Sequence, residues 1–399
     1  MAGGRDGVPD RAMPGPRDRP KRAVGGAPRE HATLTQVQVL RAVAAASVAT
    51  SHAQHDAATL ETQIGYSFQA WNPIPWSAGV DVFFVISGLI MVHASQRLFA
   101  KPGGARLFLF RRLARIVPLY WTATTLYLGV ALLAPALLNQ NYVRSEFVVA
   151  SYLFIPAARP DGVVQPVYEL GWTLNYEMLF YVLFAAALAL PLRAAAAALL
   201  AALVALVTAG RLAAPLPEPL AFWTDPILLE FAYGVTIGLM GVWGVRLRGS
   251  ARAGLAAAGL AGLLLAAAFP DIARTLPRPL DYGLPAALAV AGAALAPSGR
   301  STESRLARSA AAVGDASYAL YLLHPFVIRA TRILFWRTGL AGYLGPWAFV
   351  AAALAASFGL ALITYRYFEK PLTAQVRRLL GAEGMGRSSS RDRVHCSPP

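Results

Sequence analysis

Ten long apolar stretches, separated by short polar segments, are the feature that most restricts how this chain can fold. Of its 399 residues, 56% are hydrophobic and 14% are charged, a balance unlike that of soluble domains. A helix that crosses a bilayer needs about 20 predominantly apolar residues. The sequence therefore predicts an all-α, polytopic integral membrane protein with about ten transmembrane helices. The stretches lie near residues 34–54, 77–97, 114–138, 168–190, 194–210, 222–244, 252–269, 281–297, 314–336 and 345–366.

The distribution of Lys and Arg predicts how these helices are oriented. Seven basic residues precede residue 34, six lie between Arg97 and Arg115, and residues 53–76 contain none. Because cytoplasmic loops are rich in Lys and Arg, we expect both termini to be cytoplasmic and residues 53–76 to lie outside. The net charge of +15 does not indicate nucleic-acid binding, because the basic residues lie in the tails and in alternate loops.

Polar, basic segments flank the apolar region. Residues 1–33 and 375–399 are predicted to be disordered cytoplasmic tails around a transmembrane domain at 34–374. A basic tail before an Ala-rich helix also resembles a signal peptide, but cleavage there would remove Arg41 and His52. The single cysteine, Cys396, and the lack of Cys/His clusters with ligand spacing predict neither a disulfide framework nor a metal site.

The first apolar stretch contains Arg41 and His52, and charged residues inside a bilayer are usually functional. Eleven residues at about 100° each return to nearly the same helix face, and a rise of ~1.5 Å per residue separates the two by roughly 16 Å. One helix face therefore carries a cation in its inner half and a titratable base near its outer end. The structural alternative is an arginine that snorkels and a histidine at the outer interface.

Two acidic residues are predicted to lie at the depth of His52. Asp81 follows the outer start of the second stretch by about one turn, and Glu177 lies in the outer part of the fourth. A carboxylate beside an imidazole fixes its tautomer and raises its basicity. We therefore expect His52, Asp81 and Glu177 to converge, with one acid orienting the base. The alternative is that each acid pairs with a buried arginine.

Three arginines lie at the cytoplasmic end of the third stretch, in the segment FRRLARIVPLYW. Arg111 and Arg115 are spaced i,i+4 and share a helix face, with Arg112 beside them. Because guanidinium groups suit phosphates, the three are predicted to bind a phosphorylated donor. Ordinary anchoring of a cytoplasmic loop is the alternative. Glu369, at the end of the tenth stretch, is expected to pair with this cluster in a structural role.

Candidates for substrate contact lie on two other stretches. Trp172, Asn175 and Tyr176 begin the fourth stretch at its outer end and are candidates for contact with a sugar. An interfacial aromatic belt explains the two aromatic residues almost as well. His324, in SYALYLLHPF near the middle of the ninth stretch, is a further candidate for substrate binding. With Pro325 after it, the alternative is a role in helix packing.

Six motifs occur in the order found in the acyltransferase-3 family of membrane acyltransferases, which the chain resembles from residue 34 to about 374. The segment GWTLNYEMLFY resembles the corresponding segment of the exopolysaccharide-production branch of the family, whose members O-acetylate bacterial surface sugars. Many members of the family have the pattern W-S-L-x-x-E-E at this segment. Met178 occupies the second acidic position, so only Glu177 carries over. The six motifs are the Arg41/His52 pair, GVDVFFVISG, RRLARIVPLYW, GWTLNYE, SYALYLLHP and YRYFEKP.

The resemblance implies ten spans, acyl-CoA as donor, and Arg41 with His52 as the catalytic pair. We expect a multi-pass O-acyltransferase of the bacterial inner membrane. It would move an acyl group, acetyl by default, from cytoplasmic acyl-CoA to a hydroxyl of a surface polysaccharide or its lipid-linked precursor. No permanently bound cofactor is expected, and proteins of polysaccharide synthesis or export are candidate partners.

The sequence leaves two routes and two other functions open. His52 would act as a general base or would itself be acylated in a relay. A transporter or flippase for a lipid-linked glycan would also contain buried charges, but it would be expected to have inverted halves, and no internal repeat is visible. A non-catalytic subunit of a polysaccharide-export complex would tolerate loss of His52.

Overall fold

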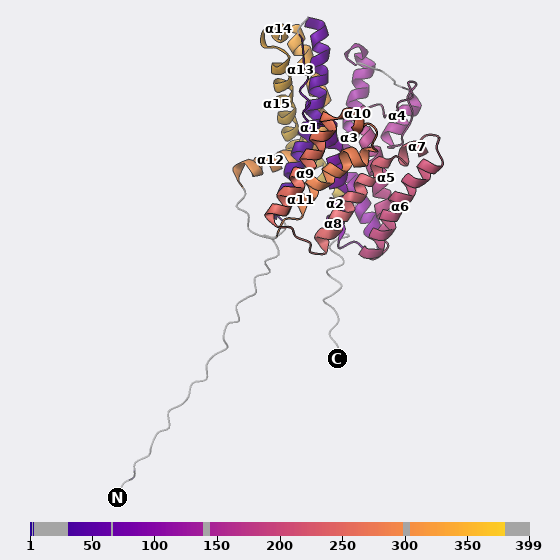
Figure 1. Ribbon diagram of the computed structural model, residues 1–399, viewed down its shortest axis with the longest axis vertical. Coiled ribbons are helices and arrows are strands. Elements are labelled where there is room, and N and C mark those ends of the chain that lie inside the picture. The colour runs from indigo at the N-terminus through magenta and orange to yellow at the C-terminus, as the bar shows by residue number, and fades with distance from the viewer. Residues whose placement is uncertain (2, 4–30, 65–66, 139–143, 298–303, 380–399) are drawn as a thin grey trace.

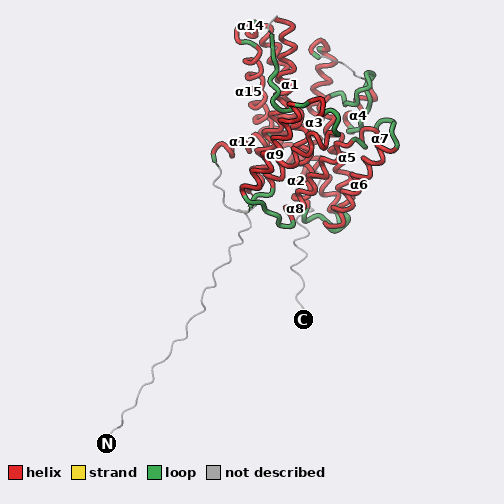
Figure 2. The backbone as a smooth tube through the Cα atoms, in the orientation of Figure 1, coloured by secondary structure: helices red, strands yellow, loops and turns green. Residues whose placement is uncertain are grey.

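The computed structural model of the chain describes residues 1, 3, 31–64, 67–138, 144–297 and 304–379. Within these residues the regular structure is helical throughout (Figure 2), apart from one isolated bridge between Ala158 and Val164. The predicted helical class is therefore confirmed. The tails expected at 1–33 and 375–399 fall largely on residues 4–30 and 380–399, which lie outside the described residues.

Each of the ten apolar stretches contains a helix. These ten helices are α1 (His31–Ile64), α2 (Gly79–Ser95), α3 (Gly104–Leu133), α5 (Trp172–Ala187), α6 (Leu192–Leu212), α8 (Leu229–Val242), α9 (Gly249–Ala268), α11 (Leu284–Ala294), α13 (Ser317–Arg337) and α15 (Pro346–Thr364). Shorter helices connect or flank them: α4 (Ser145–Tyr152), α7 (Leu220–Trp223), α10 (Pro270–Ala273), α12 (Arg305–Asp315), α14 (Leu340–Leu344) and α16 (Lys370–Leu379). The short apolar segment at 146–156 forms most of α4 and the turn that follows it.

Six helical segments of the described chain are long and apolar enough to cross a membrane, or seven if the bent pair α12 and α13, which meet at 71°, is one span. The remaining stretches are shorter or more polar. α5 has 16 residues and α11 has 11, whereas α1 carries several polar side chains on an otherwise Ala-rich helix. The described chain is thus a multi-helical membrane protein by composition, and the count of ten spans stays a prediction.

α1 is the longest helix of the described chain and extends beyond its predicted end near residue 54. Its 34 residues correspond to about 51 Å at 1.5 Å per residue. Residues 55–64 are too polar to read as a span, but Ala57 and Leu60 are buried with residues of α13 and α15 in one apolar cluster. This packing sustains the helix, so the first part of the segment expected to be an outer loop is helical. α1 also contacts α2, α11 and α12, and it lies beside α13 and α15 (Figure 1).

Close helix crossings position the elements around α1. A Cβ atom on Gly88 of α2 would clash with the carbonyl oxygen of Phe231 in α8, and one on Gly234 of α8 would clash with the carbonyl oxygen of Val85. Glycines at such a crossing let two backbones approach closely. On the other side, α3 packs against α5 through Phe108 and Phe184, whose rings stack with centroids 4.9 Å apart. These contacts place α2, α3 and α5 around one internal pocket.

Candidate functional site

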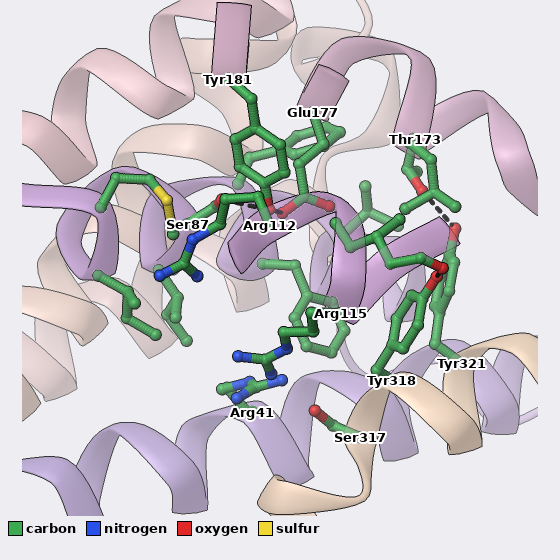
Figure 3. A pocket seen from close by; sticks show the side chains of 18 residues that line it. Arg41, Ser87, Arg112, Arg115, Thr173, Glu177, Tyr181, Ser317, Tyr318 and Tyr321 are labelled. Carbon is green, nitrogen blue, oxygen red and sulfur yellow. Dashed lines mark hydrogen bonds between the residues drawn. The ribbon is translucent and has the colours of Figure 1, made fainter. Parts of the chain in front are cut away.

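A pocket lies between α1, α2, α3, α5 and α13, and its empty space is about 780 Å³ when the part open to solvent is included. Its apolar walls are Val80, Phe83, Phe84, Ile86, Ile90, Met91, Ile116 and Leu174. Its polar lining comes from all five helices and comprises Arg41, Ser87, Arg112, Arg115, Thr173, Glu177, Tyr181, Ser317, Tyr318 and Tyr321 (Figure 3). A mostly apolar pocket with a few convergent polar groups is the usual form of a ligand site.

One end of this pocket is cationic. Arg41 is 7% exposed, and its Nη1 donates to Oε1 of Gln38 at 3.0 Å. Its guanidinium group lies beside that of Arg115, with Arg112 above them in the view of Figure 3. The Nε of Arg112 is buried and has no hydrogen-bond partner in the described structure. Guanidinium groups from two helices that face one space suit a polyanion such as a diphosphate.

The structure revises which arginines act together. Arg112 and Arg115, spaced i,i+3, line the pocket, whereas Arg111 is not among the lining residues. The expected pair Arg111 and Arg115 therefore does not face the pocket as a unit. Glu369 is buried and interacts electrostatically with Arg115 and Arg41. Among the described residues it forms no ion pair within 4 Å, and its Oε2 has no hydrogen-bond partner.

Glu177 is the acidic residue of the pocket. It accepts hydrogen bonds from the Ser87 hydroxyl at 3.1 Å and from the Tyr181 hydroxyl (Figure 3). Two donors from different helices fix the carboxylate so that it faces the arginine end of the pocket. Sequence reasoning missed both donors, although the i,i+4 spacing of Glu177 and Tyr181 is a signal for such a contact. Ser87 comes from α2 and shows no local signal.

His52 is in contact with His324. The His324 Nδ1 lies 3.0 Å from the carbonyl oxygen of Leu320, and because that oxygen can only accept, Nδ1 carries the proton. The Nε2 of a neutral His324 must then be the acceptor in its 3.1 Å contact with Nδ1 of His52. This hydrogen-bond network assigns the tautomer of His52, with Nδ1 protonated. The lone pair of His52 Nε2 is left to act as a base.

Tyr321 lies between the pocket and the two histidines. Its ring lines the pocket and packs against the His324 ring with centroids 6.3 Å apart. Its hydroxyl donates to the Leu170 carbonyl at 3.2 Å and lies 3.0 Å from Oγ1 of Thr173. Neither His52 nor His324 lines the pocket. Tyr321 is therefore the residue that is adjacent both to the pocket and to the histidine pair.

The structure does not bring Asp81 and Glu177 to His52. Asp81 is fully buried and accepts from Nε and Nη2 of Arg278 at 2.8 and 2.7 Å. Glu177 faces the arginine pocket, and the partner of His52 is His324. Residues at one depth on neighbouring helices can point in different directions, since side chains project all around a helix. Asp81 therefore pairs with an arginine, which was the alternative to its predicted place beside His52.

Of the three residues expected to contact a sugar, Asn175 and Tyr176 are buried and Trp172 is partly buried. The ring of Tyr176 stacks on Phe222 with centroids 4.0 Å apart, and Trp172 packs edge-on against Phe84 at 6.5 Å. Asn175 is 1% exposed, and neither atom of its amide has a hydrogen-bond partner in the described structure. None of the three lines the arginine pocket. Within the described residues, no group of His, Cys, Asp and Glu could hold a metal ion.

Comparison with known proteins gives one family and one curated relative. Residues 34–366 match the acyltransferase-3 family, which is described as an acyltransferase domain. The exopolysaccharide production protein ExoZ of Rhizobium meliloti (strain 1021) is 36% identical to the chain over 306 residues, which cover 75% of this chain and 90% of that protein. No solved structure matches the chain.

The pairing of Asp81 with Arg278 predicts a structural role that a stability measurement can detect. Asp81→Asn removes the charge that faces Arg278 and should lower the melting temperature of the detergent-solubilised protein. The free energy of unfolding should fall by about 1.5–3 kcal/mol, the contribution typical of hydrogen bonds to charged groups. Asp271→Asn is a matched control, because Asp271 pairs with Arg274 at the surface, where the side chains are 94% and 79% exposed. Equal stability of Asp81→Asn and Asp271→Asn would contradict the assignment.

Proposed function

The chain belongs to the acyltransferase-3 family and is an O-acyltransferase, and from this premise we propose both its substrates and its catalytic residues. It moves an acyl group, acetyl by default, from cytoplasmic acyl-CoA to a hydroxyl of an exported polysaccharide or its lipid-linked precursor. One observation carries the proposal. The same helix, α1, places Arg41 in a pocket suited to phosphates and His52 in a histidine pair with a basic nitrogen. The name of the relative from R. meliloti supports the polysaccharide as acceptor.

The proposed topology is ten spans in the inner membrane with both termini cytoplasmic. It rests on the concentration of basic residues before residue 34, between Arg97 and Arg115, and after the sixth, eighth and tenth stretches. In this orientation the arginine end of the pocket opens toward the cytoplasm, where acyl-CoA is found. His52 lies farther out along α1 by roughly 16 Å.

The donor occupies the pocket along this direction. Arg41, Arg112 and Arg115 bind the phosphates of CoA at the inner end, and the pantetheine arm extends outward past Glu177. The carboxylate of Glu177 is a suitable acceptor for an amide N–H or hydroxyl of this arm. Because Tyr321 lies between the pocket and the histidines, its ring must move aside for the thioester to reach His52.

The chemical step uses the lone pair of His52 Nε2. This nitrogen removes the proton of the acceptor hydroxyl, and the oxygen attacks the thioester carbonyl. The new C–O bond forms, the C–S bond breaks, and the proton passes from His52 to the CoA thiolate. His324 orients His52 and keeps Nε2 unprotonated through the contact at Nδ1. Acylation of Nε2 followed by transfer to the hydroxyl would use the same lone pair.

A transporter or flippase does not account for the same features. Its substrate would pass along a continuous polar path, and such a path gives no role to a hydrogen-bonded histidine pair that does not line the pocket. A non-catalytic subunit would not need the hydrogen-bond chain from Leu320 through His324 to His52. Acyl transfer explains both the arginine pocket and the histidine pair.

The role of the pocket arginines is tested by comparing two residues one turn apart on α3. Arg115→Ala should raise the KM for acyl-CoA by about 10- to 100-fold, because a charge-assisted hydrogen bond contributes about 1.5–3 kcal/mol. Arg111→Ala is the matched control, because Arg111 does not line the pocket. The KM of this variant for acyl-CoA should change by less than about twofold. Equal increases in both variants would favour general anchoring over donor binding.

The role of His52 is tested by a variant that retains a polar side chain. His52→Gln cannot take a proton, so acyl transfer by the purified protein to candidate glycans should fall about 10²- to 10⁴-fold. Binding of acyl-CoA should be retained, because His52 lies outside the arginine pocket and its replacement leaves the lining of that pocket intact. If His52→Gln keeps most of its activity, the base lies elsewhere, and His324 becomes the first residue to test.

His324 is expected to act as a positioning residue, and a conservative variant separates this role from packing. His324→Phe cannot accept from Nδ1 of His52 and should lower kcat about 10- to 100-fold, the effect seen for groups that orient a functional histidine. His324→Gln provides an acceptor oxygen and should recover part of kcat. If the two substitutions reduce kcat equally, His324 does not act through its hydrogen bond to His52.

A further inference from the structure

Two arginines on α13 and one aspartate on α1 form a charged cluster next to the histidine pair, and we propose that this cluster binds a carboxylate of an acidic acceptor glycan. The cluster, called here the outer charge cluster, consists of Asp56, Arg329 and Arg332. This inference rests on the proposed function and names the chemical class of its second substrate. A carboxylate is the group that fits, because the N–H donors of a guanidinium group match its planar pair of oxygens.

The outer charge cluster contains more positive than negative charge. Nη1 of Arg332 lies 3.1 Å and Nε of Arg329 lies 3.9 Å from the same oxygen, Oδ1 of Asp56. Among the described residues, no other acidic side chain comes within 4 Å of either guanidinium group. Two positive charges and one negative charge leave the cluster with a net charge of +1.

The buried arginine of the cluster has hydrogen-bonding capacity that the protein does not use. Arg332 is 8% exposed, yet its Nη1 forms no hydrogen bond in the described structure, and neither does Oδ1 of Asp56. The two atoms lie at ion-pair distance without the alignment of a hydrogen bond. Because a buried polar group without a hydrogen bond is costly, a second carboxylate that supplies an acceptor oxygen would bind favourably.

The cluster lies on the two packed helices that carry the histidine pair (Figure 1). Asp56 is one turn beyond His52 on α1, and Arg329 and Arg332 follow His324 on α13. In the proposed topology both helices run outward here, so the cluster lies on the outer side of the histidine pair. Four residues of helix correspond to about 6 Å, roughly the length of one sugar unit. A glycan bound by its carboxylate would therefore place a neighbouring hydroxyl near His52.

The outer charge cluster can be reached from outside the protein. His324 is fully buried, whereas His52 and Asp56 are partly exposed. The Arg329 side chain is 22% exposed and is therefore accessible to a ligand. An acceptor can thus approach His52 from this exposed side, while the donor approaches from the arginine pocket.

The nearby acidic residues do not neutralise the cluster. Glu169 interacts electrostatically with His52, but its carboxylate is held by Arg159 at 3.1 Å, and the same guanidinium group holds Asp161 at 3.0 Å. The Glu169 side chain is also 50% exposed, and exposed charges are screened by salt more than buried ones. The outer charge cluster therefore keeps its excess of positive charge.

Two forms of one oligosaccharide test this assignment in the purified full-length protein, with acetyl-CoA as donor. The acidic form is a hexuronate-containing oligosaccharide prepared from the exported polysaccharide of the producing strain, and the neutral form is its methyl ester. The preference for acid is the kcat/KM for the acidic form divided by that for the neutral form. Any change in the basicity of His52 cancels in this ratio. The wild type should prefer the acidic form about tenfold or more, because a hydrogen bond to a charged group is lost on esterification.

Two variants of the cluster should change this preference in opposite directions. Arg329→Gln removes a positive charge and should lower the preference about 3- to 10-fold, whereas Asp56→Asn removes the competing carboxylate and should raise it by a similar factor. Arg337→Gln is a matched control on α13, because Arg337 is exposed and lies outside the cluster. Its preference should equal that of the wild type.

Opposite changes distinguish carboxylate binding from a purely structural ion-pair cluster, which would leave the preference at the wild-type level in both variants. An unchanged preference in Arg329→Gln and Asp56→Asn would therefore overturn the assignment while leaving acyl transfer intact. The same conclusion would follow from equal use of the acidic and neutral forms by the wild type, or from an exported polysaccharide without acidic groups. Absence of transfer by the wild type to either form would instead overturn the proposed function.

Discussion

A polar side chain on a membrane helix must find a partner inside the protein, and the rest of this structure depends on how α1 meets that requirement. In hydrocarbon an unpaired polar group is costly. Arg41 donates to Gln38 and faces a pocket with Glu177, whereas His52 is paired with His324 on α13. Helices α2, α11, α12, α13 and α15 pack around α1, and its small residues allow them to approach closely. The polar groups of one helix are thereby distributed between two neighbouring sites.

This division suits a reaction whose substrates are in different compartments. In our proposal, the arginine pocket provides charges for a polyanionic donor, and the histidine pair provides a base whose tautomer is fixed by the Leu320 carbonyl. Tyr321 separates them and is held by hydrogen bonds to α5 and the turn before it. In our proposal the reactive thioester meets the acceptor only at His52, which limits contact between acyl-CoA and water.

Much of this arrangement could be predicted from the sequence, because hydropathy locates helices and helical periodicity places residues along them. The ten apolar stretches each contain a helix, and Arg112 and Arg115, two of the arginines expected to act together, line one pocket. Glu177, expected beside His52, lines that pocket too. The rotation of each helix about its own axis could not be predicted. Asp81 pairs with Arg278, which is 197 residues away in the sequence, and His52 contacts His324, which is 272 residues away. Such pairs depend on tertiary packing, so the contact of His52 with His324 could not be predicted from the sequence.

Transfer across the membrane is the central claim, and sealed vesicles with one orientation of the protein test it most directly. Right-side-out vesicles would be loaded with labelled acetyl-CoA, and a membrane-impermeant oligosaccharide acceptor would be supplied outside. We expect label to appear on the external oligosaccharide, and to be lost in the His52→Gln variant. Label that appears only when acetyl-CoA and oligosaccharide are on the same side of the membrane would contradict a donor pocket and a histidine site reached from opposite faces.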